Sequence, residues 1–426
     1  MESFYLLEYI KNHSSIDPII IDELKYDLDI RLYFYGKHFR NPHEDKTRSF
    51  LSVIFNFLIS SATFLRIIQK ICFNKRKNCI ISSAYFSINN ELKKNGYEVY
   101  SPSWILKSDF NIFPNLELYF ASRKLKKILS NASFYDLLSD VVISKVKDFE
   151  EKLIRIFQKG EIKAVILSND MTFFDKVLIN VCKKAGIPSF IFLHGLPGRY
   201  NIVDDNRTDY LIVWGEKIKE NYIKIGFSPN KIIVSGHPYY KSLNNKSLKF
   251  SLENILVLTK SISGGQHSDK VRLADRGNLV LYLLSVEKVL REFGIRSVRL
   301  RPHPSENINW YYCFIDKEFF VYDKFDLKKS IEYSSLVIGP TSTVFLESLY
   351  YGKNYIVYEP AIEGMDLLKF ELVPPFDKSD ERVPIATNES ELKHIIEKNI
   401  RVDKGILSEY IKTPFDLSFV KTLINK

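Results

Sequence analysis

The stretch SLVIGPTSTVFLESLYYGKNYIVYEP (residues 335–360) reads as a strand, a helix and a second strand in immediate succession. Residues 335–340 and 354–360 are short, mostly apolar runs typical of buried strands. Between them, 341–352 has helical apolar spacing and closes at Gly352, a common C-cap residue. Two strands joined by one helix lie parallel in a sheet. The stretch therefore predicts an α/β fold with a parallel sheet.

The same alternation runs through the rest of the chain. Strands are expected at 78–86, 97–103, 163–170, 187–195, 209–215, 231–238, 254–265, 296–306 and 319–324, and helices at 87–96, 121–159, 171–186, 216–226, 278–293 and 326–334. The polar, turn-rich stretch 239–253 separates two such sets. We expect two Rossmann-like lobes facing each other across a cleft, over residues 1–245 and 246–405. A last helix over 406–426 is expected to pack back on the N-terminal lobe.

Length and charge narrow the classes of protein. A chain of 426 residues exceeds the usual size of one core, which agrees with two domains. The net charge of +10 suits an anionic partner. No zinc-finger spacing or RNA-binding aromatic motif occurs, so no nucleic-acid partner is expected. No metal site is expected either, because the Asp27-Leu28-Asp29 stretch does not follow a strand. The four cysteines are scattered along the sequence, and we expect them to be reduced thiols of a cytosolic protein.

Residues 49–77 form an apolar segment that ends in basic residues. Its uncharged part, 49–65, is short for a membrane span and contains Asn56. A buried helix is the first interpretation. The alternative is a helix on the membrane surface with its basic residues toward anionic headgroups: Arg66, Lys70, Lys75, Arg76 and Lys77. The N-terminus lacks the basic start and cleavage site of a signal peptide, so we expect a cytoplasmic protein, peripheral at the inner membrane face under the alternative.

The end of the first strand in the opening stretch predicts an anion site. Gly339 is followed by Thr341, Ser342 and Thr343, whose amides and hydroxyls open the expected helix. Amide donors and the helix dipole both favour negative charge there. Glu347 lies one turn deeper on the same face and is placed to accept hydrogen bonds from sugar hydroxyls. The competing interpretation is simple N-capping by these residues.

The stretch RLRPHPSEN (299–307) supplies a second group of anion-binding side chains, at the exit of another expected strand. Open α/β sheets bind ligands at such exits, so Arg301 and His303 are expected to share a phosphate with the Ser342 region. Arg299 points to the same face as Arg301. For at least one of the two arginines, the alternative to phosphate binding is a structural ion pair. A third, weaker element is TKSISGGQ, where Gly264 and Gly265 would let backbone amides approach phosphate.

Candidate bases stand at strand exits of the first half. Asp170 follows one strand and His194 another, and either is a group that can take the proton of an acceptor hydroxyl. Asp170 alternatively caps the helix that begins at Met171, and His194 is alternatively a packed histidine. The second His-Pro pair, in VSGHP (234–238), is interpreted as a contact at the interlobe hinge.

Together, RPHPSEN and SSLVIGPTSTVFLESLYYGK in a two-lobed α/β chain resemble bacterial glycosyltransferases of the GT-B fold, and specifically the CMP-sialic acid-dependent sialyltransferases. That resemblance, carried by residues 254–360, implies that His303 and Pro304 form the His-Pro motif, with His303 on the CMP phosphate. It implies that Ser342 and Thr343 hold the phosphate and Glu347 the donor ribose. The acidic base motif of the family is absent, and SND at 168–170 departs from it.

The resemblance implies an inverting glycosyltransferase with no cofactor and no obligatory metal. Its partners would be a CMP-activated sugar and a glycan or lipid-linked glycan acceptor of surface polysaccharide, such as O-antigen, capsule or lipooligosaccharide. The motifs also fit CMP-Kdo transferases and CDP-glycerol polymerases, whose His-Gly base matches LHG at 193–195. The segment from 185 to 238 is similar to UDP-sugar 2-epimerases as well. A non-catalytic subunit that binds lipid-linked glycan is the remaining alternative.

Overall fold

The computed structural model describes residues 2–33, 50–73, 78–84, 88–105, 111–198, 200, 206–243, 247–260, 276–304, 306–362, 365–366 and 372–424. The expected lobe boundary at 245/246, Gly264 and Gly265 lie outside these residues.

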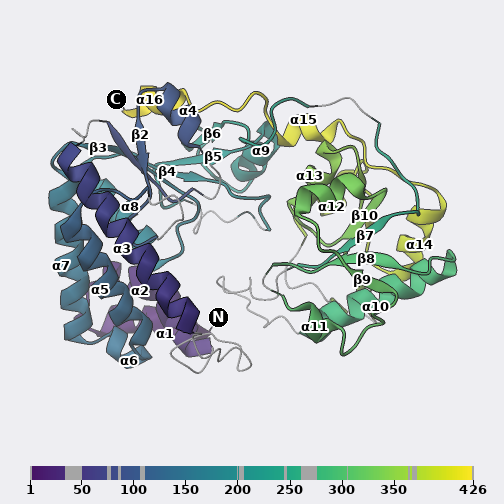
Figure 1. Ribbon diagram of the computed structural model, residues 1–426, viewed down its shortest axis with the longest axis horizontal. Helices are drawn as coiled ribbons and strands as arrows, with labels where there is room; N and C mark the ends of the chain where they lie inside the picture. Colours follow the sequence, from purple (N-terminus) through teal and green to yellow (C-terminus); the bar gives the residue numbers. More distant parts are fainter. Residues whose placement is uncertain are drawn as a thin grey trace.

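Two separate six-stranded sheets organise the chain, one at the left and one at the right of Figure 1. The N-terminal sheet has the order β2-β1-β3-β4-β5-β6, with β1 (Cys79–Ser82), β2 (Glu98–Tyr100), β3 (Ile162–Leu167), β4 (Ser189–Phe192), β5 (Tyr210–Val213) and β6 (Ile232–Val234). The C-terminal sheet has the order β14-β11-β10-β7-β8-β9, with β7 (Ile255–Leu258), β8 (Val298–Arg301), β9 (Phe320–Tyr322), β10 (Leu336–Gly339), β11 (Asn354–Tyr358) and β14 (Ile385–Ala386). Every pairing in both sheets is parallel. The α/β prediction is confirmed: these are two Rossmann-like lobes, the architecture of the GT-B fold.

The opening stretch forms β10, α13 (Val344–Tyr350) and β11, with Leu336 beside Asn354 in register. The helix begins at Val344, three residues later than predicted, so Thr341 and Ser342 belong to the turn before it. Gly352 has φ +72°, as its predicted C-terminal role requires. A two-stranded antiparallel pair, β12 (Ala361–Ile362) and β13 (Met365–Asp366), follows β11.

Helices cover both faces of each sheet. In the N-terminal lobe they are α1 (Glu2–His13), α2 (Pro18–Tyr33), α3 (Phe50–Phe73), α4 (Asn89–Lys94), α5 (Leu116–Asn131), α6 (Phe134–Leu137), α7 (Asp140–Phe157), α8 (Phe173–Ala185), α9 (Glu216–Lys224) and the 3₁₀ turn η2 (Pro229–Lys231). In the rest of the chain they are α10 (Arg276–Glu292), α11 (Ile308–Tyr311), α12 (Leu327–Tyr333), α14 (Glu389–Glu397), α15 (Ile406–Tyr410) and α16 (Phe419–Ile424). Asp326 accepts from the Lys329 amide and caps α12, as predicted.

The helical stretch expected over 121–159 is interrupted twice. It contains most of α5, which begins after the Asn115 cap, and then α6 and α7, which begin anew at serine caps. Ser133 and Asp136 form a reciprocal capping box at the start of α6, and Ser139 accepts from the Val142 amide at the start of α7. Each cap satisfies helix-end amides and thereby makes an interruption favourable.

The described side chains of α3 do not fit the buried helix of the first interpretation. Among its described side chains Thr63 and Ile67 are buried, but Leu58 is 57% and Leu65 is 65% exposed. No helix in the described part of the chain is long and apolar enough to cross a membrane. The described side chains of α3 therefore form one buried edge and one face exposed on the surface of the lobe.

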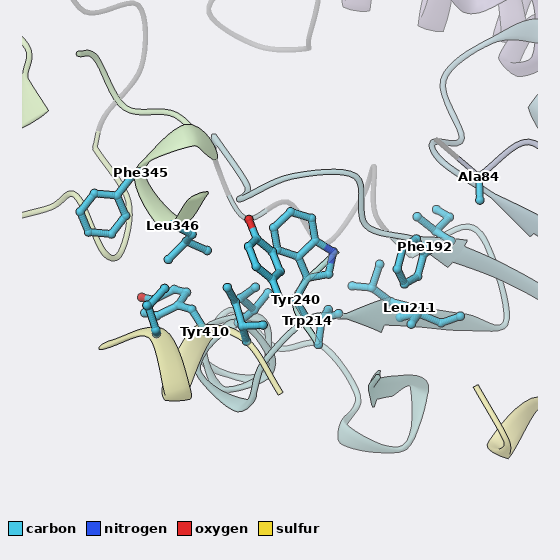
Figure 2. Packing of buried hydrophobic residues seen from close by; sticks show 14 of the residues in the cluster. Ala84, Phe192, Leu211, Trp214, Tyr240, Phe345, Leu346 and Tyr410 are labelled. Atoms are coloured by element: carbon cyan, nitrogen blue, oxygen red, sulfur yellow. The ribbon is translucent and has the colours of Figure 1, made fainter. Parts of the chain in front are cut away.

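One hydrophobic core runs from lobe to lobe. Figure 2 shows Trp214 and Tyr240 between Phe192 and Leu211 of the N-terminal lobe and Phe345 and Leu346 of α13. The aromatic contacts continue from Tyr240 to Tyr350 at the end of α13, with ring centroids 4.8 Å apart. The two sheets are thus held together by packed side chains as well as by the linker.

The chain crosses between the lobes a second time near its C-terminus. After α15, the Lys412 amide donates to the Trp214 carbonyl at 2.7 Å and the Asp416 amide to the Ser235 carbonyl at 2.9 Å. Figure 1 shows this yellow segment returning to the N-terminal lobe, where α16 lies. The expected single helix over 406–426 is therefore two short helices with an extended piece between them.

Candidate functional site

Polar side chains gather where four adjacent strands of the C-terminal sheet end. In sheet order, Glu359 follows β11, Thr341 follows β10, Lys260 follows β7 and His303 follows β8. Parallel strands present their carboxyl ends on one edge, which is the ligand-binding edge of open α/β sheets. Two predicted residues, Thr341 and His303, therefore lie on one edge, as the sequence indicated.

The carboxylate of Glu359 occupies the middle of this edge. It is 4% exposed and accepts from the Thr341 amide at 2.8 Å and from the Thr341 hydroxyl at 2.7 Å. The Lys260 ammonium lies 2.8 Å from both of its oxygens. Thr341, predicted as a phosphate donor, thus already binds an internal carboxylate. The Lys260 ammonium, with its side chain 35% exposed, is the cation that an incoming anion would meet.

His303 is fixed through its backbone, whose amide donates to the Thr259 hydroxyl at 3.0 Å. Burial lowers the pKa of the His303 imidazole, and the nearby Glu306 carboxylate opposes this shift. The ring is therefore neutral at pH 7 and offers one N–H donor and one acceptor nitrogen. Pro304, the other member of the predicted motif, is exposed.

The two arginines of RLRPHPSEN have separate roles. Arg299 forms an ion pair with Asp323 at 3.3 Å, which confirms that one of them is structural. Arg301 donates from Nη1 to the Phe325 carbonyl at 2.5 Å. Burial raises the pKa of the Glu347 carboxyl, and the Arg301 charge partly offsets this effect. The charge of Arg301 therefore acts on the carboxyl of Glu347, which lies on α13.

The exit of β4 meets the start of α13 across the two lobes. The Leu196 amide donates to the Thr343 hydroxyl oxygen at 2.9 Å. A Cβ at Gly195 would lie 2.6 Å from the same oxygen, so a larger residue there would force the Thr343 hydroxyl to move. The buried Trp214 indole holds the loop by donating to the Leu193 carbonyl at 2.7 Å. LHG and GPTST, which stand far apart in the sequence, thus lie together.

His194, the residue before Gly195, is exposed at this junction. Its Nδ1 lies 3.2 Å from the Ser168 carbonyl oxygen. A carbonyl can only accept, so Nδ1 carries the proton of the neutral ring and Nε2 is the acceptor nitrogen. This tautomer is the one that a general base needs.

Asp170 does not have the surroundings of a base. Its carboxylate is buried and forms an ion pair with Arg207 at 3.1 Å. It does not cap α8 either: Thr172 is the N-cap and accepts from the Asp175 amide at 3.4 Å. The alternative role as a helix cap was therefore wrong, and the charge of Asp170 is balanced inside the N-terminal lobe.

The remaining predicted residues have structural surroundings. A Cβ at Gly339 would lie 2.2 Å from the hydroxyl of Tyr355, which donates to the Pro340 carbonyl at 2.6 Å. The Ser342 hydroxyl accepts from the Val344 amide at 3.3 Å. His237 of VSGHP is buried beside Trp214, with ring centroids 4.3 Å apart, in the aromatic contacts that join the lobes.

Sequence reasoning missed Lys260 and Glu359. Each is the first charged residue after a buried apolar run, in LVLTK and YIVYE. That signal was available, because a charge directly after a buried parallel strand lies at the ligand-binding edge. Their pairing was not available, since it depends on the order of β11, β10 and β7 in the sheet.

Comparisons with known proteins assign no family to the chain. No protein-family model matches the chain, and no curated protein matches it. Among solved structures, the Methanocaldococcus jannaschii UDP-GlcNAc 2-epimerase in complex with UDP-GlcNAc and UDP is 11% identical with a TM-score of 0.47, over 82% of this chain and 98% of that one. The lipopolysaccharide outer core galactosyltransferase WaaB is 13% identical with a TM-score of 0.41 over 82% and 98%, and a variant of the wall teichoic acid polymerase TagF is 11% identical with a TM-score of 0.40 over 85% and 95%. Likenesses this distant assign no activity to the chain.

Proposed function

We propose that this chain is an inverting glycosyltransferase that transfers sialic acid, or a related nonulosonate, from a CMP-activated donor to a glycan of surface polysaccharide. One observation supports this proposal above the others. The β4 exit that carries His194 is bonded, through Leu196, to Thr343 beside the anion-binding edge. Transfer of a sugar from a phosphorylated donor to a hydroxyl requires a proton acceptor for the hydroxyl and hydrogen-bond donors that stabilise the departing phosphate. In this chain the two kinds of group lie on opposite lobes.

In the proposed reaction the C-terminal lobe stabilises the leaving group. The C–O bond between the anomeric carbon and the donor phosphate breaks, and its electron pair leaves with the CMP phosphate. The cations Lys260 and Arg301 and the neutral His303 ring stand near that charge, so protein donors offset it without an obligatory metal. Glu347 is assigned to the donor ribose. Transfer is accordingly expected to persist in EDTA.

The N-terminal lobe activates the acceptor. His194 Nε2 takes the proton of the acceptor hydroxyl while its oxygen bonds to the anomeric carbon on the face opposite the phosphate. The Ser168 carbonyl at Nδ1 fixes the tautomer and stabilises the imidazolium that forms. Between the two bases left open by the sequence, the buried ion pair of Asp170 with Arg207 favours His194.

The proposed acceptor is a glycan or a lipid-linked glycan, and with a lipid-linked acceptor the reaction would take place at the inner face of the cytoplasmic membrane. Closing the junction around both substrates would exclude water and limit hydrolysis of the donor.

The donor nucleotide is tested by a thermal-shift panel of CMP, CDP and UDP. Selective stabilisation by CMP is expected. Stabilisation by CDP would move the proposal to a polyol-phosphate transferase, and stabilisation by UDP, with turnover of a UDP-sugar in the absence of acceptor, would replace it with a 2-epimerase.

Substitution of His303 tests the donor half of the mechanism. His303→Ala is expected to lower transfer at least about tenfold, which is about 1.4 kcal/mol of transition-state stabilisation. Because its backbone amide keeps the bond to Thr259, the fold should persist, as circular dichroism can check. Wild-type transfer by this variant would remove His303 from the mechanism.

Substitution of His194 tests the acceptor half. His194→Gln is expected to lower kcat about a hundredfold or more, the usual contribution of a general base. Asp170→Asn is the matched comparison: it should lower stability and leave kcat near the wild-type value. The opposite outcome would make Asp170 the base.

A further inference from the structure

Helices α3 and α5 form an outer layer of the N-terminal lobe. The Tyr119 hydroxyl of α5 donates to the Ser60 carbonyl of α3 at 3.4 Å, and Arg123 donates to the Ser60 hydroxyl at 3.0 Å. The Phe64 and Phe120 rings meet with centroids 6.0 Å apart. In Figure 1, α3 is the long dark helix at the front of this lobe. The two helices therefore present one continuous surface.

Apolar side chains are exposed along both helices. On α3, Leu58, Ala62 and Leu65 are exposed at i, i+4 and i+7, so they share one face. On α5, Phe120 is 56% exposed. Leaving such side chains in water is unfavourable by roughly 25 cal/mol per Å² of apolar area. Surfaces of this kind mark contact with a partner or a membrane.

Basic side chains surround these apolar ones. Lys124 and Lys127 are exposed on α5 at i+4 and i+7 from Phe120, and Arg66 is exposed on α3 beside Leu65. In the residues of α3 and α5 together, six side chains are basic and Glu117 is the one acidic residue. The surface therefore combines exposed apolar groups with a strongly positive charge.

We propose that the exposed faces of α3 and α5 are a docking surface for an anionic phospholipid bilayer. Leu58, Leu65 and Phe120 enter the boundary between headgroups and acyl chains, and Lys124, Lys127 and Arg66 bind lipid phosphates from flexible stems. The helices lie along the membrane plane.

The combination of groups selects this partner over others. A nucleic acid would engage the cations and leave the exposed leucines in water, whereas a bilayer takes up both kinds of side chain. A second copy of the chain would bring two surfaces of the same positive charge together, which Coulomb repulsion opposes. The membrane surface is complementary in charge and in polarity.

The test is co-sedimentation of the full chain with vesicles. Wild-type protein is expected to bind vesicles of phosphatidylglycerol mixed with phosphatidylcholine, to ignore phosphatidylcholine alone, and to dissociate as salt rises. The double substitution Lys124→Glu and Lys127→Glu is expected to weaken binding at least about thirtyfold, since each basic residue near an anionic surface contributes about fivefold in affinity and the two contributions multiply. Leu65→Asp, at an exposed position, is expected to weaken it about tenfold without unfolding the lobe.

Two controls separate the surface from general charge and apolar effects. Lys328→Glu with Lys329→Glu makes the same change of charge on exposed α12 side chains of the other lobe, and Val321→Asp makes the same apolar change on β9. Both should bind vesicles as the wild type does.

Equal binding by the wild type and the α5 double variant would overturn the proposal. So would a concentration-dependent dimer, seen by light scattering, that Leu65→Asp abolishes, because the surface would then be a contact between copies. Membrane binding does not depend on the chemistry of the junction. A chain that binds vesicles and transfers no sugar would support the docking surface and contradict only the proposed function.

Discussion

Removing the Lys260 ammonium should destabilise the C-terminal lobe by leaving a buried carboxylate without its cation. In Lys260→Met the aliphatic stem is kept and the charge is lost. Glu359 would retain its two bonds from Thr341, at 2.8 and 2.7 Å, and lose both 2.8 Å contacts with Nζ. The substitution therefore isolates the ion pair from the rest of the edge.

The magnitude follows from the burial of each partner. Breaking a fully buried ion pair by removing one member costs about 3–5 kcal/mol. Lys260 keeps 35% of its side chain exposed, so water screens the pair and the expected loss falls to about 2 kcal/mol. Glu359→Gln keeps an oxygen to accept from Thr341 and leaves an ammonium that water can solvate, so it should cost about 1 kcal/mol.

Urea titration measures these losses as shifts of the unfolding midpoint. Trp310, on α11, is the one tryptophan of the sequence beyond residue 254, and its fluorescence reports on this lobe. If Lys260 and Glu359 stabilise the fold through their contact with each other, their losses of stability should not add. The double variant Lys260→Met/Glu359→Gln should then be about 1 kcal/mol more stable than the sum of the two single losses implies.

Strictly additive losses would refute the reasoning. They would mean that Lys260 and Glu359 stabilise the fold independently, and that the 2.8 Å contacts carry no free energy. A Lys260→Met protein as stable as the wild type would have the same consequence. Because Glu359 also holds Thr341, CMP affinity measured on the same variants would show whether this pair positions the proposed anion-binding edge.

Two further predictions concern the junction between the lobes. Burial lowers the pKa of His237 to about 3, below its unfolded value of 6.5, so the unfolded chain binds more protons between these values and stability falls as the pH drops below 6.5. Between pH 6.5 and pH 5 this contributes about 2 kcal/mol, and His237→Asn should show a correspondingly weaker pH dependence in urea titrations than the wild type; identical slopes would contradict it. Gly195→Ala should displace the Thr343 hydroxyl from the Leu196 amide and cost the junction about 1 kcal/mol, seen as a larger radius of gyration in small-angle scattering. Gly198→Ala, whose Cβ would have nothing within 4 Å, is the control and should scatter as the wild type does; an unchanged radius in Gly195→Ala would show that this contact does not hold the lobes.

The fold was largely predictable because its strands are buried on both faces. Runs such as residues 335–340 are continuous in apolar character, and that pattern with helices between them specifies a parallel sheet. The break in 121–159 was harder to see, since the capping box of Ser133 and Asp136 interrupts a pattern that otherwise continues as a helix. A three-residue signal of this kind is easily outweighed by the apolar periodicity around it.

The sequence could predict where the residues of the candidate site lie in the fold. It predicted less well which side chains contact each other. Strand exits placed His303 and Thr341 on one edge, because the direction of parallel strands alone decides this. Which side chain meets which depends on the order of strands in each sheet. Asp170 was named as a base because its neutralising partner, Arg207, lies 37 residues away along the chain. The Lys260–Glu359 pair, separated by 99 residues, was missed for the same reason.

The last residues of the chain have a consequence for its biosynthesis. Lys412 and Asp416 donate hydrogen bonds to carbonyls at the edge of the N-terminal lobe, and the Lys412 side chain reaches Val234 across 178 residues of sequence. A Cβ at Gly236 would lie 2.2 Å from the Lys412 carbonyl oxygen, so the two segments fit closely. During translation this lobe emerges first, yet its edge stays incomplete until the whole second lobe has been synthesised. Nascent chains stalled before residue 412 should therefore be digested by protease around 235, and chains released in full should be protected there.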